Sequence, residues 1–137
     1  MKKLLKSLVT IAVIGTMALC VAGCKPYKSV EDYVNSDIIQ SEVESTNENS
    51  DDIKMEITAE GDALVYQYTY SETITDEEEL AFCQETFESE LSANESTFVD
   101  IADSLYDVAD VKDPSVIVRY LNADGSVIYE TEFPASK

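Results

Sequence analysis

The stretch Pro114–Phe133, PSVIVRYLNADGSVIYETEF, decides which fold this chain can adopt. Two runs of alternating apolar and polar residues flank Asp124–Gly125, a dipeptide typical of the type I′ turn of a β-hairpin. With that turn, Arg119 lies opposite Glu130, so opposite charges meet on one face. The other face is apolar and consists of Val116, Val118, Tyr120, Val127, Tyr129 and Phe133. A hairpin with one apolar face predicts a sheet that needs a covering layer.

A second hairpin is predicted over residues 53–70, with its turn at Glu60–Gly61 or at Gly61–Asp62. Both registers leave the large apolar side chains on one face, because side chains alternate along a strand. These side chains are Ile53, Met55, Ile57, Leu64, Tyr66, Tyr68 and Tyr70. The chain therefore holds two hairpins of the same kind.

A helix is predicted before the first hairpin. Ser29 precedes two acidic residues, which is the pattern of an N-cap followed by an acidic first turn. Apolar residues then keep helical spacing, so we expect a helix over residues 30–44. The polar run Glu44–Asp52 predicts a loop.

A longer helix is predicted between the hairpins. Thr75 and Glu78 form a capping box, and an amphipathic pattern continues to about Ala109. Near Asn94 the capping pattern recurs, which leaves open a break or kink there. The apolar stripe consists of Leu80, Cys83, Phe87, Leu91, Phe98, Ile101, Leu105 and Val108.

The expected fold class is α+β, with the element order αββαββ. Two one-sided hairpins and a long one-sided helix bury their apolar faces together when the helix lies on one face of a four-stranded antiparallel sheet. Each half of the chain would then be a helix followed by a hairpin, which suggests an internal duplication as a hypothesis.

The N-terminus has the pattern of a secretory signal. Met1–Lys6 carries three lysines, and an apolar stretch follows over Leu8–Val21. That stretch is short for a permanent membrane span, which needs roughly 20 apolar residues. The sequence VAGC that ends at Cys24 resembles the lipobox of bacterial lipoproteins, in which the cysteine is lipidated. We expect cleavage between Gly23 and Cys24, with an uncleaved anchor as the alternative.

The predicted organisation is a signal peptide over residues 1–23, a lipidated tether over 24–28 and one small domain over 29–137. Cys20 is a poor alternative for lipidation, because Leu19 before it is bulky. Two acyl chains give stable anchoring. We therefore expect the protein on the extracytoplasmic face of the cell membrane, held by its N-terminal lipid.

The chain is strongly acidic, with a formal net charge of −19. Removing the leader and its three lysines makes this −22. Such a charge excludes binding to nucleic acid through electrostatic attraction. Between Met55 and Val111 there is no Lys or Arg, so the surface could attract a cationic envelope or extracellular partner; solubility is the alternative reason for it.

Catalytic and metal-binding patterns are missing from the sequence. The chain has no histidine, which excludes the usual nucleophilic triads and most zinc sites. Cys83 falls on the apolar helix stripe, and we interpret it as a buried structural cysteine. Asn122–Gly125 echoes part of a calcium loop, but Tyr120 stands where the first acidic ligand belongs, so we interpret it as a turn. We expect no enzyme activity, no cofactor and no metal.

Tyrosines are concentrated on the apolar face of the predicted sheet. Tyr66, Tyr68, Tyr120 and Tyr129 could line a groove that stacks on a peptide or a glycan, with each phenol offering a hydrogen bond. The alternative, which we favour, is that the long helix covers this face and that the hydroxyls reach water at its edges. The apolar residues of that helix, Phe87 among them, need a surface to pack on.

Four segments resemble the bacterial lipoproteins grouped as domain of unknown function family 4854. They are YKSVEDYVNS at Tyr27–Ser36, the stretch Ala59–Tyr70, STFVDIADSL at Ser96–Leu105, and Pro114–Phe133. The resemblance covers nearly the whole chain after the leader. It implies a surface lipoprotein of Gram-positive type and adds no catalytic residue or ligand.

Two classes of function follow from these observations. The first is a non-enzymatic binding or interaction module at the cell envelope, acting through the acidic helix face or an edge strand. The second is a sensor or carrier for a small ligand or a cation, which needs a cavity beneath the helix or a cluster of carboxylates.

Overall fold

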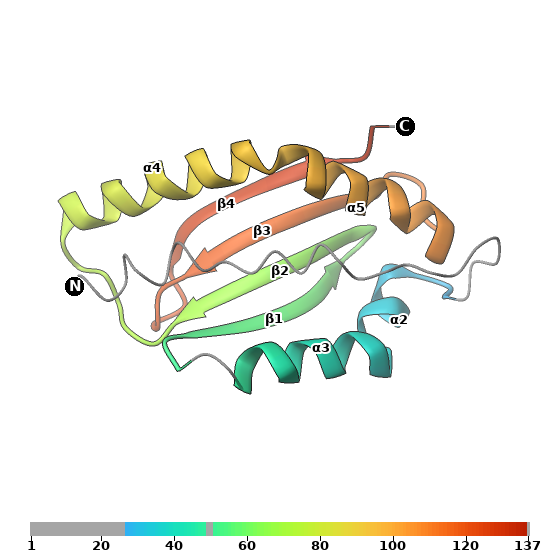
Figure 1. Cartoon of the computed structure of the whole chain (residues 1–137), viewed down its shortest axis with the longest axis horizontal. Coiled ribbons are helices and arrows are strands. Elements are labelled where there is room, and N and C mark those ends of the chain that lie inside the picture. The colour runs from blue at the N-terminus through green and yellow to red at the C-terminus, as the bar shows by residue number, and fades with distance from the viewer. Residues whose placement is uncertain (1–26, 49–50, 137) are drawn as a thin grey trace.

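The computed structural model describes residues 27–48 and 51–136 (Figure 1). The predicted signal peptide, its cleavage site and Cys24 lie outside these residues. The element order is ααββααββ, so each predicted helix is in fact a pair of helices. The elements are α2 (Val30–Val34), α3 (Asp37–Glu48), β1 (Ile53–Glu60), β2 (Ala63–Tyr70), α4 (Glu77–Ala93), α5 (Glu95–Val108), β3 (Ser115–Leu121) and β4 (Val127–Pro134).

The four strands form one sheet in the order β1-β2-β3-β4, and this sheet is mixed. Each hairpin is antiparallel as predicted, but β2 and β3 pair in parallel, with Tyr68 beside Tyr120. The prediction of an all-antiparallel sheet was therefore wrong. The reason is the connection: α4 and α5 carry the chain back along the sheet, and such a helical crossover brings the next strand in parallel.

Both halves of the chain consist of a helix pair followed by a hairpin, which the duplication hypothesis requires. The corresponding strands nevertheless occupy different places, because β1 is an edge strand and β3 is an inner strand. The hypothesis stays a prediction.

The first hairpin turns at Gly61 and Asp62, one of the two registers predicted. Gly61 has a φ of 62°, a left-handed conformation that glycine adopts without steric cost. Met55 pairs with Tyr68 and Ile57 with Tyr66, which confirms that the apolar residues of both strands share one face.

The second hairpin has the predicted register away from its turn, including Arg119 opposite Glu130. Its turn differs. The N–H of Gly125 donates to the carbonyl of Asn122 at 2.9 Å, and Gly125 has a φ of 90°, so the turn is centred one residue earlier than predicted. The ladder shifts after Tyr120, as in a hairpin with a glycine bulge. The prediction that Val127 belongs to the apolar face was therefore wrong: Val127 is 55% exposed, and Ile128 is buried instead.

The first helix pair is longer than predicted. Ser29 is the N-cap of α2, because its hydroxyl accepts from the N–H of Asp32, as predicted. The chain breaks after Val34 and continues as α3 to Glu48, through residues predicted as a loop. The side chain of Asn47 explains this extension, because it accepts from the N–H of Met55 at 2.7 Å and donates to the carbonyl of the same residue at 2.9 Å. These bonds fasten the end of α3 to the edge strand β1.

The predicted long helix is two helices, α4 and α5, that meet at Asn94. The amide of Asn94 donates to the carbonyl of Glu90 at 2.8 Å, which satisfies one of the free carbonyls at the end of α4. The N-cap of α4 is Asp76 rather than Thr75, since the carboxylate of Asp76 accepts from the N–H of Glu79.

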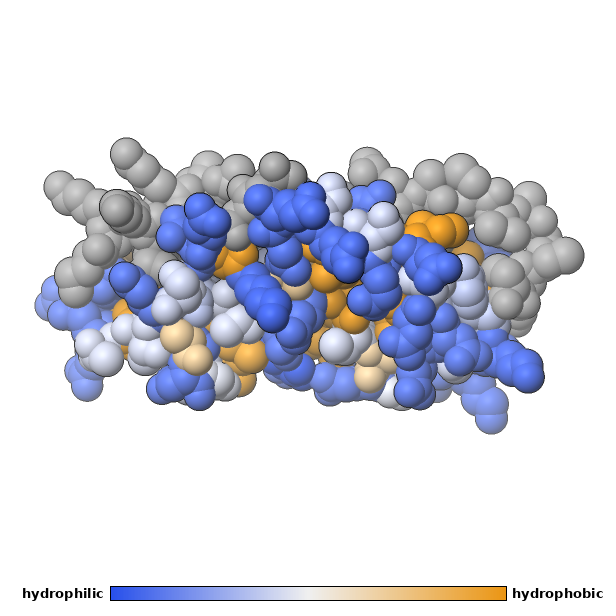
Figure 2. Space-filling view, turned by 90° about the horizontal axis from the view of Figure 1, so that it is seen from below, coloured by the Kyte–Doolittle hydropathy of each residue, from blue (hydrophilic) through white to orange (hydrophobic). Residues whose placement is uncertain are grey.

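The four helices of the described residues lie on one face of the sheet, in two groups (Figure 1). The pair α2 and α3 covers β1, whereas α4 and α5 cover β3 and β4. The buried side chains of sheet and helices form a single core. Hydrophilic side chains cover most of the side that carries α3 and β1, and hydrophobic ones show between them, mainly in the middle of this view (Figure 2).

The opposite face of the sheet carries no helix within the described part of the chain. Arg119 lies there and forms a 2.8 Å ion pair with Glu60 of β1. It also forms an ion pair with Glu130 of β4 and a hydrogen bond of 3.3 Å with Gln67 of β2. The prediction that Arg119 is a cross-strand ion-pair partner is confirmed, and this one side chain connects all four strands.

Phe87 of α4 is the side chain that joins the two layers most closely. It is fully buried, and its ring stacks on Tyr120 with 3.8 Å between centroids and 11° between planes. Its ring also lies 6.3 Å from that of Tyr70. Phe87 therefore fills the space between tyrosines of two neighbouring strands.

Replacing Phe87 by Ala should lower the free energy of unfolding by about 3–5 kcal/mol, because it empties a fully packed site. Urea denaturation followed by circular dichroism measures this. The matched control is Phe82→Ala on the same helix, where the side chain is 52% exposed and a change within about 0.5 kcal/mol is expected. Equal losses in both variants would contradict this account of the core.

Candidate functional site

The tyrosines singled out from the sequence lie in different environments. Tyr66, Tyr68 and Tyr120 are buried beneath the helices, and Tyr129 of β4 is half-buried at the edge of the core. Aromatic rings from the helices occupy the space above them, since Phe98 packs edge-on against Tyr66. The face is therefore covered, as the favoured alternative held, and these tyrosines do not form an open groove.

The hydroxyls of three tyrosines have no hydrogen-bond partner. The prediction that the hydroxyls reach water was wrong for Tyr66, Tyr70 and Tyr120: these side chains are at most 2% exposed, and their oxygen atoms are buried and unpaired. A buried polar group without a partner costs about 1–3 kcal/mol, and such groups are few in native proteins. Three such hydroxyls on one sheet face are therefore an unusual feature of this core.

These three phenols belong to a larger group, the phenol cluster, which consists of Tyr33, Tyr66, Tyr68, Tyr70 and Tyr120. Tyr68 and Tyr120 are stacked, with ring centroids 5.2 Å apart. Burial is the main cause that raises the pKa of every member, and it raises that of Tyr33 to about 12. Their close approach adds to the shift: Tyr68 raises the pKa of Tyr66, Tyr70 and Tyr120. The cluster is therefore neutral at physiological pH and can both donate and accept hydrogen bonds.

The side of α4 that faces the cluster carries acidic groups and a thiol. Cys83 is buried as predicted, and burial followed by the charge of Glu79 raises the pKa of its thiol. Burial is the main cause that raises the pKa of Tyr70 and of Tyr120. Cys83 adds to the raised pKa of Tyr70, and Glu90 adds to that of Tyr120. One carboxylate oxygen of Glu79 is buried without a partner. The thiol is thus held neutral.

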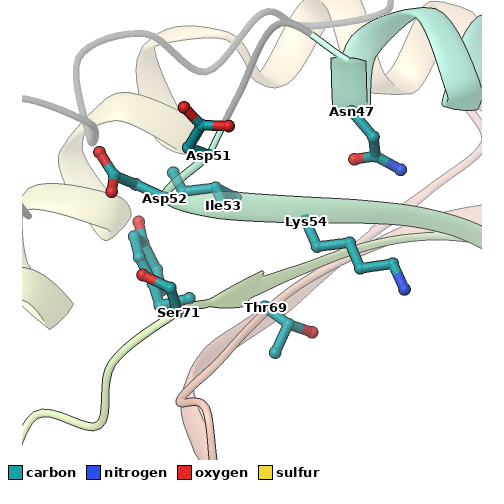
Figure 3. A pocket seen from close by; sticks show the side chains of 8 residues that line it. Asn47, Asp51, Asp52, Ile53, Lys54, Thr69 and Ser71 are labelled. Atoms are coloured by element: carbon teal, nitrogen blue, oxygen red, sulfur yellow. The ribbon is translucent and has the colours of Figure 1, made fainter.

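Tyr70 also lines a pocket of about 470 Å³ at the end of the β1–β2 hairpin, between α3 and β2. Figure 3 shows Asp51 and Asp52 at one end of this pocket, just before β1. The amine of Lys54 points away from both carboxylates (Figure 3). Asn47, Ile53, Thr69 and Ser71 complete the lining.

The other features that could indicate a functional site give less support for one. Within the described ranges, no group of three or more acidic, cysteine or histidine side chains is placed to hold a metal ion. The loop Asn122–Gly125 is a turn, in which the amide of Asn122 accepts from the N–H of Ile74 and donates to Ser126. Its role is to hold the segment before α4 against the second hairpin. None of the helices within residues 27–48 and 51–136 has both the length and the apolarity that a membrane span requires.

Sequence reasoning missed three residues of this region. Asp51 and Asp52 fall at the end of the run predicted as a loop, and Glu79 directly follows the predicted capping box without any role assigned to it. The signal that could have found Glu79 is its position four residues before Cys83, which puts it on the apolar stripe of the helix. Nothing local marks Asp51 or Asp52, because the pocket arises from the meeting of α3, β1 and β2.

Comparison with known protein families shows a match over most of the chain. Residues 30–133 match the family described as Domain of unknown function (DUF4854). No curated protein and no solved structure matches the chain at a significant level.

The phenol cluster predicts how the fold responds to alkali. Phenols whose pKa is raised in the folded state contribute stability that is complete below about pH 10, the ordinary pKa of tyrosine, and is lost as the pH rises further. We expect the phenolate absorbance of the buried tyrosines to increase together with the loss of circular dichroism in one transition above pH 10. Ionisation of all tyrosines while the circular dichroism stays native would show that the cluster is open to water.

Proposed function

The chain belongs to the DUF4854 family, and on that footing we propose that its mature form, residues 24–137, is a lipid-anchored binding module on the extracytoplasmic face of a Gram-positive-type cell membrane. It acts without catalysis. Its binding site is the region where the phenol cluster meets the pocket at Tyr70.

The proposed localisation rests on the N-terminal leader and its VAGC motif at residues 21–24. The described fold begins at Tyr27, three residues after Cys24. The N–H of Tyr27 donates to the carbonyl of Val108 at 3.0 Å, and the ring of Tyr27 lies 5.2 Å from that of Tyr33. A chain cut before Cys24 would therefore retain every helix and strand described above.

Changing Cys24 to Ser should release the protein from the membrane fraction, because no acyl chains can then be attached. Cell fractionation and labelling with palmitate measure this. The matched control is Cys20→Ser, four residues earlier, which should leave both membrane attachment and labelling unchanged. Membrane attachment that survives Cys24→Ser would favour an uncleaved anchor.

The binding role rests on one observation: the hydroxyls of Tyr66, Tyr70 and Tyr120 and one carboxylate oxygen of Glu79 are buried without partners, and Tyr70 also lines the pocket. A ligand that hydrogen-bonds to these atoms removes their desolvation cost, so binding gains free energy that the empty fold does not have. The same argument supports a carrier or sensor of a small molecule over a module that docks only through its outer surface.

A purely surface-docking role is the second candidate. It is favoured by the acidic exterior of α4, where Glu77, Glu78, Glu85 and Glu88 carry no basic neighbour in the segment between Met55 and Val111. A cationic protein partner at the envelope would fit such a surface. It would not need the buried phenols.

A thermal-shift screen separates the two candidates. We expect the mature chain, with Cys24→Ser to keep it free of lipid, to gain several degrees in Tm with at least one class of small organic ligand. Tyr70→Phe and Tyr120→Phe, which remove one hydroxyl each, should weaken that shift. Tyr129→Phe is the control, because this tyrosine is half-buried and its hydroxyl is not among the unpaired ones.

Two results would contradict the small-ligand role. One is the absence of a shift with every small ligand, together with a shift caused by cationic peptides alone. The other is a ligand shift that Tyr70→Phe and Tyr120→Phe leave unchanged.

A further inference from the structure

The sheet of the described residues has two edge strands, β1 and β4. In the β1–β2 hairpin, the carbonyl of Asp52 accepts from the N–H of Ser71 at 3.0 Å, so the backbone groups of every second residue from Asp52 onward face β2. The residues between them direct their backbone groups away from the sheet, and these groups form the outer edge of β1: Ile53, Met55, Ile57 and Ala59. An edge of this kind can pair with a strand of another chain.

An amide side chain from a helix bonds to the backbone of each edge strand. Asn47 of α3 accepts from the N–H of Met55 at 2.7 Å and donates to the carbonyl of Met55 at 2.9 Å, which are the two bonds that a neighbouring strand would form there. On β4, the amide of Gln84 donates to the carbonyl of Ile128 at 3.0 Å. Because the two amides come from different helix pairs and act on opposite edges, this arrangement indicates protection of the sheet against strand addition.

The cover over the outer edge of β1 is held by few contacts. The helix α3 lies along β1 (Figure 1), and its buried residue, Ile39, is near the start of the helix. Val43 is partly buried against the core, and the last turn of α3 carries no buried residue. The attachment of that turn to β1 therefore depends on the two bonds of Asn47.

The sequence of β1 suits antiparallel pairing with a second copy of the same strand. When two copies pair symmetrically about Ile57, the outward backbone groups of Met55 meet those of Ala59 in the second copy. Lys54 then lies opposite Glu60 of the second copy, and symmetry repeats this attraction. Glu56 lies opposite Thr58, so no two like charges face each other directly across the pair.

We propose that the outer edge of β1 is a self-association surface for a second copy of this chain, and that the amide of Asn47 keeps this surface closed. When the amide is lost, the backbone of Met55 becomes available, the last turn of α3 moves aside, and the sheets of two copies join through their β1 strands. The inference depends on neither the ligand nor the lipid of the proposed function.

Sedimentation velocity under reducing conditions tests this inference on the mature chain with Cys24→Ser. We expect the parent to stay monomeric and Asn47→Ala to form dimers, with a dissociation constant at least about tenfold lower, since the pairing recovers two backbone hydrogen bonds in each copy. Asn47→Asp keeps the acceptor for the N–H of Met55 and loses the donor to its carbonyl, so its association should fall between the two. Asn94→Ala is the matched control, because that amide bonds to a carbonyl of its own helix and should leave the protein monomeric.

Two substitutions added to Asn47→Ala locate the interface. Ala59→Pro removes an outward N–H and leaves the bonds between β1 and β2 intact, so it should restore the monomer. Lys54→Glu places carboxylates opposite each other at both ends of the symmetric pair and should weaken association by about tenfold. Lys28→Glu makes the same change of charge at an exposed position outside β1 and should leave association unchanged.

Four results would overturn the proposal. One is a parent chain that already dimerises, and another is Asn47→Ala that stays monomeric with native circular dichroism. The third is association that Ala59→Pro does not reduce, because a different surface then carries it. The fourth is equal weakening by Lys54→Glu and Lys28→Glu, which shows an effect of net charge alone. If Asn47→Ala fails to fold, the comparison of Asn47→Asp with the parent decides the same question.

Discussion

Parallel pairing between β2 and β3 joins residues 63–69 to residues 115–121, and the position of the other elements depends on it. It sets Tyr68 beside Tyr120 in register, so that their rings stack. The crossover that makes the pairing possible must lie on one face, and it brings Phe87 onto the ring of Tyr120. The remaining strands add to the two outer sides of this pair, and α2 and α3 then cover what α4 and α5 leave open over β1.

The same arrangement creates both the core and the candidate site. Tyrosine is large and apolar enough to fill a core, but it carries a hydroxyl that needs a partner. A phenylalanine ring that covers a tyrosine ring offers no hydrogen bond to the tyrosine hydroxyl. Three tyrosine hydroxyls remain unpaired here. The proposed capacity for a ligand would therefore depend on the same side chains as the stability of the two-layer packing, and replacing a ring by an aliphatic side chain would damage both.

Much of the local structure follows from sequence because short-range patterns determine it. Strand faces, the pairing of Arg119 with Glu130, the Ser29 cap and the burial of Cys83 each depend on residues a few positions apart. The direction in which β3 joins the sheet does not depend on such short-range patterns. It is set by the path of the two helices, α4 and α5, that connect β2 to β3. The sequence shows a turn glycine at Gly125. The bulge that turns Ile128 inward depends instead on how β3 and β4 pair beside that turn. The hairpin register brings Asp52 beside Ser71 and Tyr70, but the pocket itself also needs the end of α3, which only tertiary packing brings there.

Tyr27 has a consequence for how the domain is presented. Its backbone bonds to the end of α5, and it forms a single parallel bridge with Ala109. Three residues of extended chain reach only about 10 Å. A lipid on the cysteine three positions earlier would thus leave almost no slack, and the corner formed by α2 and the end of α5 would rest against the headgroups. If Cys24 carries the lipid proposed above, this short connection would keep the domain close to the bilayer surface, unlike a receptor on a long stalk.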